Sequence, residues 1–168
     1  MSAHRNDFLC QSSHPASPSS LNWQLFSHSL ARMGHPLTTA YTTLGPEGLQ
    51  HSLDEPSVRM VFTNSALLGT LEKVVDQCPS LVWVIYDGED TVDQVRKELP
   101  RSGSLLTFMD LQSLVQRLND KLAARERPGR ILSLAEVTEL GKANMVTAED
   151  GFGGRPARKD LYCIMVRH

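Results

Sequence analysis

The sequence lacks a long hydrophobic run, an excess of charge of either sign and an apolar leader at its start. Its longest unbroken apolar stretch is Leu81–Tyr86, far shorter than the roughly 20 residues of a membrane-spanning helix. Lys and Arg total 17 against 19 Asp and Glu, a net charge of −2, which excludes a basic nucleic-acid-binding surface as the main role. Within the first twenty residues no apolar stretch is longer than Phe8–Cys10, which excludes a secretory signal. These absences predict an intracellular, cytoplasmic protein with no transmembrane segment and no nucleic-acid partner.

Cysteines are few, and no pattern of metal ligands or nucleophiles is present. The three cysteines, Cys10, Cys78 and Cys163, stand far apart without CxxC spacing, which argues against a disulfide framework or a zinc site. The six histidines never occur at HxH or HxxxH spacing, and there is no GxSxG motif for a nucleophilic serine. Gly151–Gly154 precedes an expected strand and has no helix behind it, so this glycine cluster is interpreted as a flexible loop rather than a phosphate-binding loop.

What the sequence does contain is a loose start followed by a regular series of helical and extended segments. Residues 11–20 hold five serines, two prolines and no Asp, Glu, Lys or Arg, so residues 1–20 are expected to form a loose Ser/Pro-rich tail. Apolar residues at steps of three and four predict helices around 23–33, 46–53, 64–78, 111–122 and 134–140. Apolar, β-branched and aromatic runs predict strands at 36–41, 58–62, 81–86 and 161–166.

Leu81–Tyr86 decides the fold class, because this run does not alternate between apolar and polar residues. Such a strand is typical of a parallel sheet buried on both faces by helices. The order strand, helix, strand, helix, strand over residues 36–86 is a βαβαβ pattern. The sequence therefore predicts an α/β fold with a mostly parallel sheet. The acidic turn Asp87–Asp90 then falls at the carboxyl end of a strand, where open α/β sheets gather ligands, although a solvated loop is the simpler interpretation.

Capping residues set the expected helix ends. Gly34 and Gly141 stand where two helices are expected to end. Asn64 and Asp110 are expected N-caps, and Ser133 with Glu136 three residues later has the pattern of a capping box. Residues 142–159 are expected to form a polar surface loop.

Several short segments, in this order, resemble one known family. They are Asn22–Leu25, Thr38–Leu49, His51–Leu53, Phe62–Asn64, Val84–Gly88, Glu139–Lys142 and Asp160–Met165. Together they span residues 21–165 and are similar to the fungal long-chain fatty acyl-CoA synthetases, AMP-forming enzymes of the adenylate-forming ligase family. The resemblance implies a partial parallel-sheet α/β sandwich, the incomplete N-terminal domain of an adenylate-forming enzyme, within residues 21–168. In the family, the strand that matches Asp160–Met165 leads into the phosphate loop that binds ATP.

The departures from the family pattern concern the chemistry more than the scaffold. Thr42 replaces the usual aspartate and Pro46 a glutamate, both acceptable at a helix entry. After Met165 the sequence reads Val166–His168, with no phosphate loop, and the later adenine-binding and lid motifs are not among the 168 residues. No catalytic, cofactor-binding or metal-binding residue is carried over from the family. The resemblance implies ATP, Mg²⁺ and CoA for the full-length family, and none of them for these 168 residues alone.

Two hypotheses of different classes remain open. The chain is a truncated fatty acid–CoA ligase without activity of its own, or it is a non-catalytic interaction module that binds a full-length synthetase or itself. An unrelated Rossmann-like domain for a small ligand is the weaker alternative. The resemblance implies a fatty acid as the ligand of the family, and membranes of the endoplasmic reticulum, lipid droplets or peroxisomes as its place of action. Because the elements that follow in the family are not among the 168 residues, the isolated chain is expected to expose apolar surface and to be molten, oligomeric or insoluble without a partner; a cooperatively folded monomer would favour the interaction module.

Overall fold

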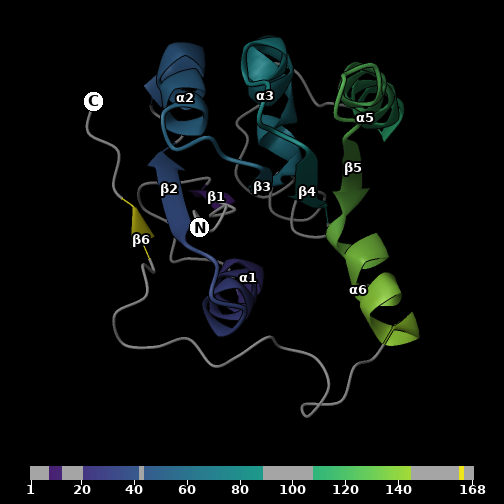
Figure 1. Ribbon diagram of the computed structural model, residues 1–168. Helices are drawn as coiled ribbons and strands as arrows, with labels where there is room; N and C mark the ends of the chain where they lie inside the picture. The colour runs from purple at the N-terminus through teal and green to yellow at the C-terminus, as the bar shows by residue number, and fades with distance from the viewer. Residues whose placement is uncertain (1–7, 13–20, 42–43, 89–107, 145–162, 165–168) are drawn as a thin grey trace, which may run out of the picture.

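A six-stranded sheet forms the centre of the protein in the computed structural model, which describes residues 8–12, 21–41, 44–88, 108–144 and 163–164 (Figure 1). The strands are β1 (Phe8–Ser12), β2 (Leu37–Tyr41), β3 (Met60–Asn64), β4 (Trp83–Asp87), β5 (Arg130–Ser133) and β6 (Cys163–Ile164). Their order in the sheet is β5-β4-β3-β1-β2-β6, and every neighbouring pair is parallel. The predicted α/β class with a parallel sheet is confirmed.

The expected strands appear with small shifts. β3 begins two residues later than predicted, because Ser57 has a φ of 54° and Val58 donates its N–H to the Leu53 carbonyl at 2.9 Å, which keeps both residues in a turn. In β4, Val84 and Ile85 are buried on opposite faces of the sheet, as the unalternating run predicts. Trp83, at the start of the strand, is instead 36% exposed.

The predicted loose tail is wrong for residues 8–12. These residues form β1, which lies inside the sheet and pairs with β2 on one side and β3 on the other. The strand is hard to recognise in the sequence, because its only apolar residues are Phe8, Leu9 and Cys10 and the Ser- and Pro-rich residues 11–20 follow them directly. Two neighbouring strands supply hydrogen-bonding partners that no local pattern reveals. The boundary at residue 20 stays a prediction.

β5 is a strand that the sequence pattern does not predict. It has four residues and only Ile131 and Leu132 are apolar. Its position is set by β4, since the Arg130 N–H donates to the Val82 carbonyl at 2.9 Å. The preceding Gly129 is buried so close to that carbonyl that a Cβ atom would overlap the oxygen. Backbone contact with a neighbouring strand, rather than local hydrophobicity, therefore places β5.

Helices cover both faces of the sheet (Figure 1). One face carries α2 (Gly45–Asp54), α3 (Leu68–Val74) and α5 (Phe108–Ala123), and the other carries α1 (Leu21–Arg32) and α6 (Leu134–Ala143). Short 3-10 turns, η2 (Ser65–Leu67) and η3 (Val75–Gln77), extend α3 at its two ends. The first layer is called the three-helix layer below and the second the two-helix layer.

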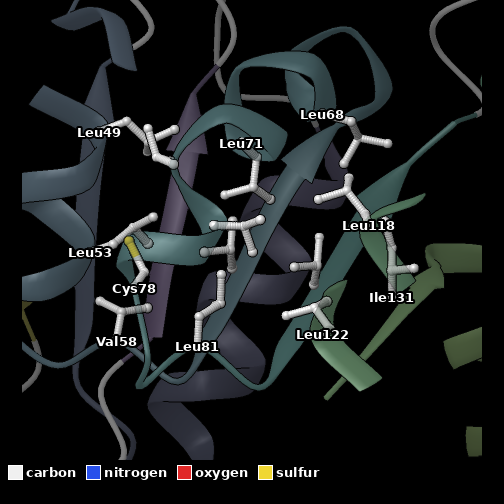
Figure 2. Close-up of a cluster of buried hydrophobic side chains, with 14 of the residues drawn as sticks. Leu49, Leu53, Val58, Leu68, Leu71, Cys78, Leu81, Leu118, Leu122 and Ile131 are labelled. Atoms are coloured by element: carbon white, nitrogen blue, oxygen red, sulfur yellow. The ribbon is translucent and has the colours of Figure 1, made fainter. Parts of the chain in front are cut away.

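The larger core lies between the sheet and the three-helix layer. Figure 2 shows leucines of α2, α3 and α5 converging on the sheet, with Cys78 among them. The cluster contains sixteen buried residues: Ala40, Leu49, Leu53, Val58, Val61, Leu68, Leu71, Val74, Val75, Cys78, Leu81, Val84, Leu114, Leu118, Leu122 and Ile131. The predicted apolar faces of these three helices are confirmed. Their burial supplies most of the apolar stabilisation of the described fold.

The smaller core lies under the two-helix layer. Its four fully buried residues are Leu30, Leu37, Phe62 and Ile85, and partly buried side chains of α1 and α6 pack around them. The rings of Phe26 and Phe62 stack with centroids 4.5 Å apart and an angle of 16° between their planes. This stack fixes α1 to β3.

Most predicted helix ends are confirmed, and two are corrected. Gly34, with a φ of 73°, follows α1, and Asn64 caps η2 by accepting the Leu67 N–H at 3.2 Å on Oδ1. Asp110, expected as an N-cap, lies in the first turn of α5, which begins at Phe108. Gly141, expected to end α6, lies inside it, because the helix continues to Ala143. The predicted polar loop lies outside the described residues except for 142–144, and 142–143 belong to α6.

Candidate functional site at the carboxyl edge of the sheet

The carboxyl ends of β3, β4 and β5 bring polar residues to one edge of the sheet. Asn64 and Asp87 are register partners at the ends of β3 and β4, and Tyr86 is the partner of Ser133 at the end of β5. Because all strands are parallel, these ends meet at the same edge, which is where open α/β sheets bind ligands. We call Asn64, Asp87 and Ser133 the carboxyl-edge residues.

Asp87 is a buried polar group of this edge. Its side chain is buried, and its Oδ2 accepts a hydrogen bond of 2.8 Å from the Nδ2 of Asn22, in the first turn of α1. The bond joins residues 65 positions apart in the sequence. A buried carboxylate needs such a donor, since an unpaired buried charge is strongly destabilising. Asp87 therefore anchors the start of α1 to the end of β4.

The end of β5 carries a complete capping box. Ser133 donates its N–H and its hydroxyl to Glu136 Oε2 at 2.7 Å and 2.8 Å, and the Glu136 N–H donates to Ser133 Oγ at 3.2 Å. Hydrogen bonds from the Ser133 backbone and side chain lower the pKa of Glu136. The predicted capping box is confirmed, and it places a second carboxylate near the same edge.

Burial and the Glu136 carboxylate act on the neighbouring phenol. Burial of the ring is the main cause that raises the pKa of Tyr86, and the negative charge of Glu136 adds to it. A phenol that stays protonated at neutral pH is a hydrogen-bond donor and acceptor. The described edge thus combines acidic and neutral polar groups.

The predicted acidic turn is only partly visible at this edge. Asp87 and Gly88 belong to the described residues, whereas Glu89 and Asp90 lie outside them, as does the glycine cluster at 151–154. Asp87 is a buried anchor rather than the solvated loop residue that the simpler interpretation expected. No three acidic, histidine or cysteine side chains of the described residues gather in a metal-binding group.

Cys78 is buried in the larger core. Burial raises the pKa of the Cys78 thiol to about 11, with the Asp54 charge as a smaller cause. Such a thiol is an inert core residue rather than a nucleophile. His28 and His51 lie on the surface, and His51 contacts Glu55 across one helical turn at 3.3 Å. Cys163 lies in β6.

Comparison with known proteins gives clear relatives. The sequence is 32% identical over 99 residues to long-chain-fatty-acid–CoA ligase 1 of Schizosaccharomyces pombe, a match that covers 58% of this chain and 15% of the relative. It is 26% identical over 155 residues to long-chain-fatty-acid–CoA ligase 1 of Saccharomyces cerevisiae, covering 90% of this chain and 20% of that enzyme. This chain is similar to part of the fungal long-chain fatty acid–CoA ligases. It spans about a fifth or less of their length.

The fold agrees with this relationship. An adenylation domain of a carboxylic acid reductase from Segniliparus rugosus, solved with AMP and a co-purified carboxylic acid, superposes with a TM-score of 0.64 at 11% identity. The superposition covers 94% of this chain and 22% of that domain. The described sheet and its helices are therefore part of the adenylate-forming fold. No protein-family model matches the sequence.

The Asn22–Asp87 bond connects two of the segments on which the resemblance to the ligases depends. Asn22 belongs to the segment Asn22–Leu25, and Asp87 belongs to Val84–Gly88. Reasoning from the sequence names both segments without pairing them, because nothing local indicates that the start of α1 reaches the end of β4. The sequence gives one hint of this pairing, which is that each of the two segments contains a polar residue beside apolar residues. The bond therefore brings these two segments together at the carboxyl edge of the sheet.

Proposed function

We propose that the chain is the scaffold part of the adenylating domain of a long-chain fatty acid–CoA ligase. Such an enzyme joins a fatty acid to AMP and then transfers the acyl group to CoA. The observation that carries the proposal is that three relatives named as long-chain fatty acid–CoA ligases match 90% of the chain. The adenylate-forming fold of the described residues supports it independently.

The described residues do not fit the groups that adenylation requires. Holding a triphosphate needs cationic side chains or backbone N–H groups directed at the anion, together with a magnesium ion. The carboxyl edge instead presents the carboxylates of Asp87 and Glu136, which repel phosphate, and Asp87 is occupied by Asn22. Since the described part of the chain also lacks a metal-binding cluster, we assign no catalytic step to it.

We therefore expect the 168-residue chain by itself to form no acyl-adenylate. The sequence matches the family up to Met165 and contains no phosphate loop within its 168 residues. Removing the groups that stabilise a transferring phosphate costs most of the rate enhancement.

An assay of pyrophosphate release tests this expectation. The purified chain, ATP, Mg²⁺ and palmitate are mixed, with the Saccharomyces cerevisiae ligase 1 as the positive control under the same conditions. We expect release at the background rate from the chain and clear turnover from the control. Turnover by the chain above a buffer blank would contradict the proposal.

Place of action and partners are proposals from the same relationship. The described part of the chain contains no helix that is long and apolar enough to cross a membrane. Action at the endoplasmic reticulum, at lipid droplets or at peroxisomes is implied by the family alone. Fatty acid as the ligand likewise depends on the relatives, and self-association or binding to a full-length synthetase is the interaction-module alternative. The exposed side chains of Leu21 and Leu25 on α1 and of Leu140 on α6 support the interaction-module alternative.

A further inference from the structure

Few apolar side chains hold the end of the sheet that β5 forms. Among the described strands, β5 lies at the edge and pairs with β4 alone. Ile131 is its one side chain in the larger core. Helix α6 follows β5 directly and has no buried residue, and its Leu134 and Val137 pack partly buried against the smaller core. Elements with so few buried apolar contacts open locally at a low cost in free energy.

Backbone hydrogen bonds fix the start of β5. The Gly129 N–H donates to the Leu122 carbonyl at 3.0 Å, which folds the connection after α5 back onto the end of that helix. The Arg130 N–H donates to the Val82 carbonyl at 2.9 Å, which begins the ladder between β5 and β4. Both bonds depend on the position of the connection between α5 and β5, because that connection carries their donors.

Arg125 fastens this connection to the chain that leads into β4. Its Nη1 donates to the carbonyls of Cys78 and Leu81 at 3.1 Å and 2.9 Å, and its Nη2 donates to the carbonyl of Val75. The three carbonyls belong to η3 and the turn after it, 44 to 50 positions earlier in the sequence. Two of them also accept backbone bonds within the turn, from the N–H groups of Cys78 and Leu81, both at 3.1 Å. One guanidinium thus joins two distant connections through charge-assisted hydrogen bonds, which are stronger than neutral ones.

We propose that Arg125 is a latch that keeps β5 and α6 docked on the sheet as one unit. When its hydrogen bonds break, β5 leaves β4 and takes α6 with it, because the capping box of Ser133 and Glu136 joins the two elements without a loop. The latch at the amino end of the sheet therefore determines whether Ser133 stays at the carboxyl edge. The rest of the larger core remains, since Ile131 is the one member of its sixteen buried residues that lies in β5 or α6.

Hydrogen–deuterium exchange of the full 168-residue chain, resolved by element, tests the latch. Arg125→Met keeps a long unbranched side chain without hydrogen-bond donors. Arg125→Lys keeps a charge and donors but not the planar fork that reaches several carbonyls. The exposed Arg127, two residues further along the same connection, supplies the matched controls Arg127→Met and Arg127→Lys. Exchange is followed in β5 and α6, with α1, which packs on β1 and β2, as the internal reference.

We expect the amides of β5 and α6 to exchange about tenfold or more faster in Arg125→Met than in the wild type, and by a smaller factor in Arg125→Lys. Exchange in α1 should change by less than about twofold, because α1 opens without breaking the bonds of Arg125. Both Arg127 variants should match the wild type.

Three results would overturn the proposal. Unchanged exchange of β5 and α6 in Arg125→Met would mean that they open with Arg125 in place. Equal acceleration of α1 and α6 would mean that Arg125 stabilises the whole chain rather than one unit. Acceleration of β5 without α6 would mean that the two elements do not open together.

A variant that does not fold leaves the test intact. If Arg125→Met is unfolded, the comparison of Arg125→Lys with Arg127→Lys is judged by the same three criteria. The measurement uses neither ATP nor fatty acid, so its outcome is independent of the proposed function, which the assay of pyrophosphate release tests separately.

Discussion

The two faces of the sheet differ in the size of the hydrophobic core that the described helices bury. Among the described residues, sixteen are buried between the sheet and the three-helix layer, and four are buried under the two-helix layer. Both layers are made by helices on the same parallel strands, so the difference lies in the helices rather than in the sheet. In the described part of the chain, a single set of strands thus carries a larger core on one face and a smaller core on the other.

Polar contacts between elements also stabilise the three-helix layer. Arg117 Nε lies 2.7 Å from Glu72 Oε1 and Lys121 Nζ lies 2.8 Å from Asp76 Oδ2, which join α5 to α3 and η3. Arg125 donates from Nη1 to the carbonyls of Cys78 and Leu81 at 3.1 Å and 2.9 Å, and from Nη2 to the carbonyl of Val75. Arg125 thereby links the segment after α5 to carbonyl groups of η3 and of the chain that follows it.

The largest expected contrast is between two leucine substitutions. Leu118→Ala opens a cavity in the larger core, where the side chain is fully buried, and should lower the free energy of unfolding by about 2–5 kcal/mol. Leu25→Ala, at an exposed position of α1, should change it by about 0.5 kcal/mol or less. Urea denaturation of both variants measures the contrast. Similar losses in the two variants would show that α1 is packed as tightly as α5.

A pair of glycine substitutions sharpens the comparison at the backbone level. Gly129→Ala places a Cβ against the Val82 carbonyl and should destabilise the β4–β5 contact by about 1–3 kcal/mol. Gly141→Ala, inside α6 with open space around it, should stabilise by about 0.5–1 kcal/mol. Thermal melting of each variant gives the sign. A stabilising Gly129→Ala would mean that β5 does not approach β4 as described.

Loss of the capping box should weaken α6 by a smaller amount. Ser133→Ala removes the acceptor for the Glu136 N–H and should cost about 1 kcal/mol. Ser133→Thr, which keeps a hydroxyl, is the matched control and should lose less. The helical signal in circular dichroism during chemical denaturation reports the change. If Ser133→Ala and Ser133→Thr are equally unstable, the hydroxyl is not the stabilising group.

Acid should produce the smallest effect, because the groups concerned are near the surface. A hydrogen bond from Arg117 is the main cause that lowers the pKa of Glu72, and hydrogen bonds from Ser133 lower that of Glu136, both from 4.5. A lowered folded-state pKa means that the stabilisation is present above pH 4.5 and is lost as the pH falls through the folded value. Unfolding free energies measured from neutral pH downward should therefore decline below pH 4.5.

Glutamine variants separate the two faces in that titration. Glu72→Gln removes one titrating group from the three-helix layer, and Glu136→Gln removes one from the two-helix layer. In each variant the free energy of unfolding should therefore fall less steeply as the pH is lowered. A decline that is unchanged in both variants would assign the acid sensitivity to other carboxylates. Exposed pairs contribute little, so the differences should be modest.

Much of the fold could be predicted from the sequence, for reasons that individual elements make clear. Helical spacing predicts the buried faces of α3 and α5, because one row of leucines and valines meets the sheet in each case. β4 is predictable because a strand buried on both faces needs no polar positions. β1 and β5 are not, since both are short and are stabilised mainly by neighbouring strands that lie far away in the sequence.

The carboxyl edge was predictable only in outline. The turn after β4 marks it, because ligands gather where parallel strands end. The bond between Asn22 and Asp87 could not be predicted, since it depends on how α1 crosses the sheet. The exposed position of Leu21 and Leu25 was hidden for a similar reason, as the apolar pattern of α1 shows which residues are hydrophobic but not which side meets the sheet.

Hydrogen–deuterium exchange of the free chain tests the contrast between the two faces most directly. Slow exchange requires a well-packed core above each helix, and local opening is easier where fewer apolar contacts must break. The account predicts that backbone amides of α3 and α5 exchange at least about tenfold more slowly than those of α1. Equal protection of α1 and α5 in the isolated chain would contradict the claim that the core under the three-helix layer is the larger and more stable of the two.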